Sequence, residues 1–120
     1  MVYCSINEWA VKKNYANFVA YDKEYPIEET LTDMLEEMSA LMDDEMGNYS
    51  GTEITDTKYV KILRNIAYRG VELMIDEEEG RNQGVATMTY IPKDYLYSRD
   101  RARLQHIGAL KGDLSVGDVG

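Results

Sequence analysis

The side chains best suited to chemistry are few in this chain. Cys4 is the only cysteine and His106 is the only histidine. A single thiol can form neither an intrachain disulfide nor a thiolate metal cluster. One histidine excludes most zinc sites, and any histidine-activated nucleophile would have to use that residue. We therefore expect no metal, no cofactor and no catalytic residue, and hence no enzymatic activity.

Carboxylates could also bind a metal, and Asp43, Asp44 and Glu45 lie close to Gly47. A calcium loop of the EF-hand type needs alternating acids, then a glycine and a closing glutamate, and this register does not fit. Paired carboxylates for glycoside hydrolysis need a spacing and apolar surroundings that no two acids here display. The acids are better interpreted as a solvated helix end.

A basic segment contains Arg99, Arg101 and Arg103. It could bind phosphate, but alternate positions on a helix face different directions and Asp100 interrupts the run. A contact with protein is the better interpretation. We expect this segment to meet a complementary acidic segment across a subunit boundary. That acidic segment consists of Asp76, Glu77, Glu78 and Glu79.

Two long amphipathic helices are predicted to position these segments, over residues 26–46 and 56–77. Both place apolar residues at three- and four-residue steps, and the glycine-containing turn between them favours an antiparallel pair. The predicted apolar stripe of the second helix consists of Tyr59, Ile62, Leu63, Ile66, Ala67, Gly70, Leu73 and Met74. Gly70 lies on the apolar stripe of the second helix, where it allows close helix packing. The opposite face of the first helix is acidic, and its candidate channel-facing acids are Glu29, Asp33, Glu36 and Glu37.

Shorter elements flank this pair. Ser5 and Glu8 have the spacing of a capping box for a short N-terminal helix, and residues 16–25 are interpreted as a connector. Residues 84–91 alternate β-branched side chains, which predicts an extended arm or short strand within about 80–92. A last helix is predicted from Lys93 to about His106, with Gly108 ending it.

The predicted fold class is all-α: a small helical bundle built on the long antiparallel pair, with the arm and a C-terminal tail. The length of 120 residues fits one domain, which we assign to residues 1–107. Residues 108–120 are interpreted as a docking tail. We expect neither a membrane span nor a secretory signal. The candidate docking residues of the tail are Leu110, Leu114, Val116 and Val119.

Charge is unevenly distributed along the chain, whose formal net charge is −9. Residues 1–56 contain thirteen acidic and three basic residues, whereas residues 57–120 contain nine acidic and ten basic residues. Binding to nucleic acid requires clustered lysine and arginine side chains that displace counterions from phosphate. The first half of the chain is therefore expected to repel nucleic acid.

The segment Tyr3-Cys4-Ser5-Ile6-Asn7-Glu8, the helix from Glu28 to Met46 closing on Gly47-Asn48-Tyr49, and the second helix with Ile66-Ala67-Tyr68 resemble the head-to-tail connector adaptors of tailed viruses. The resemblance covers about residues 3–75. It is a pattern of helix lengths and turn signatures and includes no catalytic motif. Residues 80–120 depart from it, because they form a longer arm and tail than the smallest members have.

The resemblance implies a structural virion protein, made in the host cytoplasm and located in the neck between capsid and tail. Its subunits would form a ring, commonly of about twelve copies, around passing DNA that is not bound specifically. Partners would be further copies of itself, the portal protein, and a tail or stopper protein. The alternative is a small acidic mimic of nucleic acid that inhibits a DNA-binding enzyme. The ten basic residues of the second half argue against that alternative.

Overall fold

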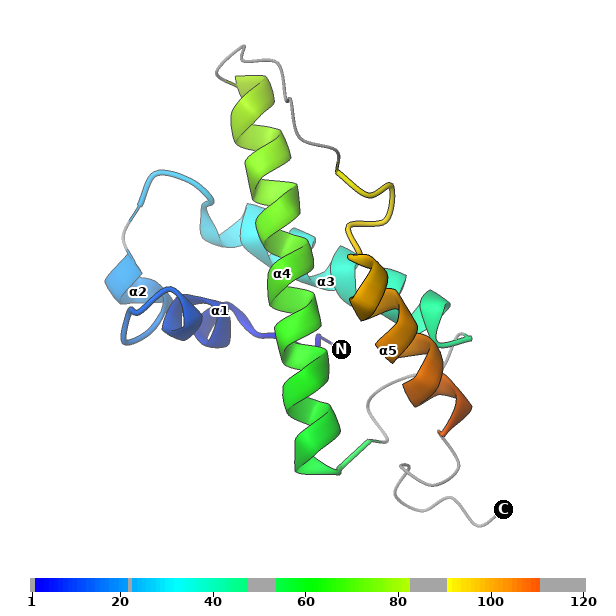
Figure 1. The fold of residues 1–120 in the computed structure, drawn as a ribbon. Helices are drawn as coiled ribbons and strands as arrows, with labels where there is room; N and C mark the ends of the chain where they lie inside the picture. The colour runs from blue at the N-terminus through cyan, green and yellow to red at the C-terminus, as the bar shows by residue number, and fades with distance from the viewer. Residues whose placement is uncertain (1, 22, 48–53, 83–90, 111–120) are drawn as a thin grey trace.

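The computed structural model describes residues 2–21, 23–47, 54–82 and 91–110. Helices make up 71% of these residues, and the described ranges contain no β-strand, in agreement with the predicted helical class. Figure 1 shows the elements in chain order. They are α1 (Ile6–Lys12), α2 (Phe18–Tyr21), α3 (Glu28–Glu45), α4 (Thr57–Asn82) and α5 (Ser98–Ala109).

The N-terminal helix α1 begins with the predicted capping box. The Glu8 amide donates to Ser5 Oγ at 3.1 Å, and the Ser5 amide donates to Glu8 Oε1 at 2.9 Å. Trp9 is fully buried, and its ring packs edge-on against Tyr21, with 4.9 Å between ring centroids. Tyr21 belongs to α2, which lies within the predicted connector. A four-residue helix is too short to show helical periodicity, so the sequence pattern did not reveal it.

The segment before α1 is anchored to α3. The Tyr3 amide donates to Ser39 Oγ at 3.0 Å, and the Tyr3 hydroxyl donates to Asp43. Cys4, the residue that follows Tyr3, is fully buried. Burial and, to a smaller extent, the negative charge of Glu8 raise the pKa of the Cys4 thiol to about 12. The thiol is therefore protonated at neutral pH and belongs to the core.

This environment makes the Cys4 thiol a probe of N-terminal packing. We expect native protein at pH 8 to react with a thiol reagent such as dithionitrobenzoate at least about a hundredfold more slowly than urea-unfolded protein, because reaction requires local opening. Cys4 is the only thiol in the sequence, so absorbance of the released thiolate reports this site alone. Equal rates in the native and unfolded protein would show that residues 2–5 are not packed against α3.

Helix α3 buries the predicted apolar stripe, including Leu31, Leu35, Met38 and Met42. It begins at Glu28 and not at the expected Pro26. Pro26 is buried, follows a cis peptide bond and lies before the N-cap residue of the helix. The helix ends at Glu45, and Gly47 adopts a positive φ of 83° in the turn that follows. That conformation favours glycine, as the predicted chain reversal requires.

Helix α4 is longer than predicted. Asp56 caps its first turn by accepting a hydrogen bond from the Lys58 amide at 2.9 Å, and the helix continues to Asn82. Residues 80–82 are therefore helical, which corrects the expected start of the arm. Its buried face includes Val71 and Ile75, which the predicted stripe omitted. That stripe instead included Tyr59, Ile62 and Leu73, which are only half-buried.

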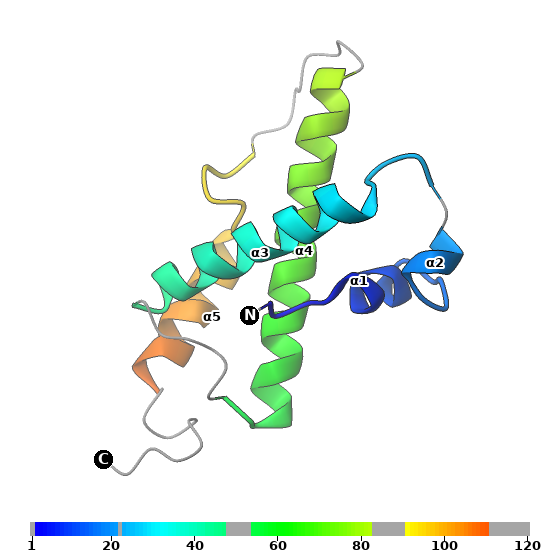
Figure 2. The same cartoon turned by 180° about the vertical axis from the view of Figure 1, so that it is seen from behind.

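The contact between α3 and α4 is close at Gly70. A Cβ atom on Gly70 would lie 2.2 Å from Met38 Sδ, so the absence of a side chain lets the helices approach, as the sequence predicted. In Figures 1 and 2, however, α3 crosses α4 obliquely and does not lie along it. Helix α4 therefore continues on both sides of the crossing, with its first turns on one side and its last turns on the other (Figures 1 and 2).

Helix α5 begins at Ser98, five residues after the predicted start, because the chain first turns at residues 93–95, where Tyr95 has a positive φ of 59°. Leu96, Leu104 and Ile107 are buried, and Tyr95 is half-buried. Gly108 does not end the helix, which continues to Ala109. Residues 108–110 thus belong to α5 and its cap, and not to a separate tail. The helix contacts both α3 and α4 and completes the core.

Two of the predicted segments lie outside the described residues. The first is the arm or strand at 84–91. Only Ile91 of that segment is described, and it is in neither a helix nor a strand. Of the candidate docking residues, Leu110 is the half-buried C-cap of α5. Leu114, Val116 and Val119 lie outside the described residues, so their docking role stays a prediction.

Candidate interaction surfaces

Two ion-pair systems hold α5 in place, and the first involves Arg69 of α4. Its Nε donates to Asp100 Oδ2 at 2.9 Å, and its Nη2 donates to Asp100 Oδ1 at 2.7 Å. Asp100 is only 1% exposed. A bidentate pair with a buried carboxylate fixes both distance and orientation. This pair therefore sets how α5 lies on α4.

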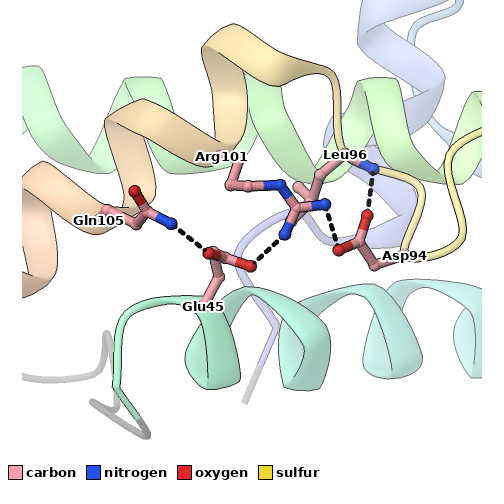
Figure 3. A network of polar contacts seen from close by, with 5 residues as sticks. All are labelled: Glu45, Asp94, Leu96, Arg101 and Gln105. Atoms are coloured by element: carbon pink, nitrogen blue, oxygen red, sulfur yellow. Dashed lines mark hydrogen bonds and ion pairs between the residues drawn. The ribbon is translucent and has the colours of Figure 1, made fainter.

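The second system joins α5 to the end of α3 (Figure 3). The Arg101 guanidinium forms ion pairs with Glu45 and Asp94, and Gln105 Nε2 donates to Glu45 Oε2 at 2.7 Å. Burial by itself would raise the pKa of Asp94, but the hydrogen bond and positive charge of Arg101 lower it below its usual value. The hydrogen bond from Arg101 to Asp94 is also the main cause of the raised pKa of Arg101.

These contacts change the interpretation of the basic segment. Arg101, expected at a subunit boundary, is held within its own chain by Glu45 and Asp94. Arg99 and Arg103 are exposed on α5. Asp100 interrupts the basic run in the sequence, and its role as a buried ion-pair partner was not predicted. A signal was present, because Asp100 lies four and seven residues before Leu104 and Ile107, on the apolar stripe of the helix.

A basic groove lies between the first turns of α4 and the helix α5. It has a volume of about 360 Å³. Its apolar lining comes from Tyr59, Ile62 and Ile107, and its polar lining includes Lys58, Arg103 and His106. A smaller adjoining hollow brings Arg99 next to the Arg69 and Asp100 pair. Because that pair is neutral overall, the exposed charge around the groove is positive.

An acidic groove of about 230 Å³ lies between α3 and the later turns of α4. Asp33 and Glu37 line it from α3, and Glu77 and Glu78 line it from α4. The Tyr95 hydroxyl donates to Glu77 Oε1 at 2.7 Å, which ties the turn before α5 to this groove. The structure therefore places part of the predicted acidic segment beside two of the candidate channel-facing acids.

Most of the candidate acids on α3 and α4 are exposed. Glu29, Asp33, Glu36 and Glu37 are all exposed on α3, with its apolar stripe turned inward. Asp76 is exposed on α4, and Glu79 is half-buried. Among the residues that the structure describes, no cluster of three or more His, Cys, Asp or Glu side chains is arranged to hold a metal ion. Within the same ranges, no helix is long and apolar enough to cross a membrane.

Charge is segregated along α4 itself. Residues 57–69 contain four basic side chains and no acidic one, whereas residues 70–82 contain five acidic side chains and one basic one. Part of this charge is neutralised within the chain, because Arg64 pairs with Glu8 at 3.1 Å and Lys13 pairs with Glu72. Lys58 and Lys61 at one end and Asp76 at the other remain exposed. The helix therefore carries opposite charge at its two ends.

Comparisons with protein-family models, curated proteins and solved structures found no match to this chain.

Proposed function

We propose that this protein is a structural component of a tailed-virus particle, a head-to-tail adaptor whose subunits form a ring between the portal and the tail or stopper protein. The ring would be located in the virion neck and would line the channel through which DNA passes. The observation that carries the proposal is the acidic face of α3, where four acids, Glu29, Asp33, Glu36 and Glu37, are exposed on one helix. Like charge lowers affinity for phosphate, so such a face would let DNA pass without binding it.

The proposal treats α3, α4 and α5 as a small bundle that forms the rigid body of each subunit. The contacts of α5 with both α3 and α4 support this description. The antiparallel alignment expected for α3 and α4 is not part of the proposal, because the two helices cross in both views of the fold. Assembly and channel lining are the proposed activities, and no catalytic role is assigned to any residue.

The test is the mass of the purified protein in solution. Light scattering over a range of concentrations is expected to show growth from a small species into a closed ring, because the charged ends of α4 favour contact between copies. Mixed with the portal protein of the same virus, the ring is expected to co-migrate with it on size exclusion. A protein that stays monomeric at every concentration and ignores the portal would contradict the adaptor function.

The second candidate, an acidic mimic of nucleic acid that inhibits a DNA-binding enzyme, draws on the same exposed acids of α3. The exposed cations Lys58, Arg99 and Arg103 favour the adaptor, because a mimic must present negative charge over its binding surface. A monomer that inhibits a nuclease in proportion to its concentration would reverse this ranking.

A further inference from the structure

The basic groove between α4 and α5 combines two properties that suit a protein partner. Tyr59, Ile62 and Ile107 provide apolar surface, and Lys58 and Arg103 provide positive charge beside it. Protein interfaces commonly surround an apolar centre with charged groups that select the partner and its orientation. The complementary partner is therefore an acidic segment of a protein chain.

The later turns of α4 have this chemistry. Asp76, Glu77, Glu78 and Glu79 follow one another around the helix, whereas the preceding Met74 and Ile75 are buried in the core of their own subunit. Four consecutive positions on a helix point in different directions, so the acids surround this end of α4 and are not confined to one face. The acidic end of α4, defined as residues 76–79, is thus complementary in charge to the basic groove.

The two features cannot meet within one subunit. Lys58 and Glu77 belong to the same helix and are nineteen residues apart, which corresponds to roughly 28 Å along the axis at 1.5 Å per residue. A continuous helix cannot fold back on itself, so the complementary surfaces can only be brought together by a second copy. A contact between two different patches of identical subunits is heterologous, and such a contact repeats around a ring when the rotation between subunits closes.

We propose that the basic groove of one subunit receives the acidic end of α4 from the next subunit. The inference rests on the proposed ring and specifies the surface that closes it. It differs from the interface expected from the sequence, because Arg101 is held by Glu45 and Asp94 within its own chain. In the proposed interface, Lys58 of α4 provides positive charge in place of Arg101. The basic run on α5 gave no indication of this role for Lys58.

A polyanion such as DNA is the other occupant that a positively charged groove could attract. The chain has a formal net charge of −9, and α3 exposes a row of acids, so the long-range field opposes a polyanion. A helix end of the same protein presents its negative charge locally, where it can reach Lys58 and Arg103 at the groove. These considerations favour a second copy.

The test uses two charge-reversed variants of the full chain. In the groove variant, Lys58→Glu and Arg103→Glu make the groove acidic while the end of α4 stays acidic. In the end variant, Asp76→Lys, Glu78→Lys and Glu79→Lys change the formal charge of residues 76–79 from −4 to +2, so the end is basic while the groove stays basic. Each variant alone is expected to self-associate at least about tenfold more weakly than the original protein in sedimentation experiments. An equimolar mixture is expected to assemble again, because each groove then meets an end of opposite charge.

The matched control for the groove variant reverses the same amount of positive charge elsewhere. Lys61 and Lys93 are exposed and do not line the basic groove, so Lys61→Glu with Lys93→Glu is expected to leave association within about threefold of the original. Circular dichroism and thermal melting of every variant confirm that the helical fold is retained. The groove residues Lys58 and Arg103 make no ion pair with a described residue that would be lost on substitution.

The outcomes separate this inference from the proposed function. If the groove variant assembles as well as the original, or the mixture does not assemble, the interface is wrong even though a ring forms. If assembly depends on the groove but the ring does not bind the portal protein, the proposed interface is correct and the proposed adaptor function is wrong. Binding of a duplex oligonucleotide that the groove variant loses, without self-association of the original protein, would overturn the second copy as the occupant.

Discussion

Replacing Arg69 with methionine is expected to destabilise the fold by about 3 kcal/mol or more, because the change leaves the Asp100 carboxylate buried without its partner. Asp100 is 1% exposed and receives two hydrogen bonds from Arg69, at 2.7 and 2.9 Å. Without them, the carboxylate must stay charged in a poorly solvated place, take up a proton, or pull α5 away from α4. Urea unfolding followed by far-ultraviolet circular dichroism measures the loss of unfolding free energy.

The control for lost charge is Arg99→Met. Arg99 is an exposed arginine on the same helix as Asp100, so its loss is expected to change the unfolding free energy by no more than about 0.5 kcal/mol. The double variant Arg69→Met with Asp100→Leu removes both charges and is expected to recover most of the stability, since a buried pair can be replaced by apolar groups at little cost. If Arg69→Met and Arg99→Met lose the same stability, the pair does not hold α5 to α4.

The two long helices could be predicted from the sequence because their apolar residues recur with helical spacing. The stripe from Leu31 to Met42 on α3 is buried, and Gly70 lies where the side chain of Met38 packs directly against α4. The direction in which the helices cross was not predictable. A glycine-containing turn fixes only that the chain reverses, whereas the crossing depends on how side chains such as Met38 fill the space around Gly70.

The basic groove could not be predicted from the sequence. It joins Lys58 and Tyr59 to Arg103 and His106, which lie more than forty residues apart in the chain. Periodicity identifies the inner face of each helix but says nothing of how far one helix is displaced along another. In this protein that displacement is set by the buried Arg69 and Asp100 pair and by the contact of Gly108 with α3. Only the positive character of α5 could be predicted.

Gly108→Ala is expected to destabilise the protein by about 1–3 kcal/mol, although alanine is favoured over glycine inside a helix by about 1 kcal/mol. A Cβ atom on Gly108 would lie 2.5 Å from the carbonyl oxygen of Met46 and 3.0 Å from its Cα and carbonyl carbon. These are backbone atoms at the end of α3, which cannot rotate away as a side chain can. The substitution must therefore displace α5 from α3, and unfolding by urea measures the resulting loss.

Gly70→Ala provides the comparison that isolates this cause. Its added Cβ would meet only the side chain of Met38, whose flexible end can shift, so it is expected to cost less stability than Gly108→Ala. Ala102→Gly at an exposed position of α5 measures helix propensity alone. If Gly108→Ala instead stabilises the protein by the amount that Ala102→Gly loses, α5 is not seated against the end of α3. The basic groove, which α5 forms with α4, would then lack its second wall.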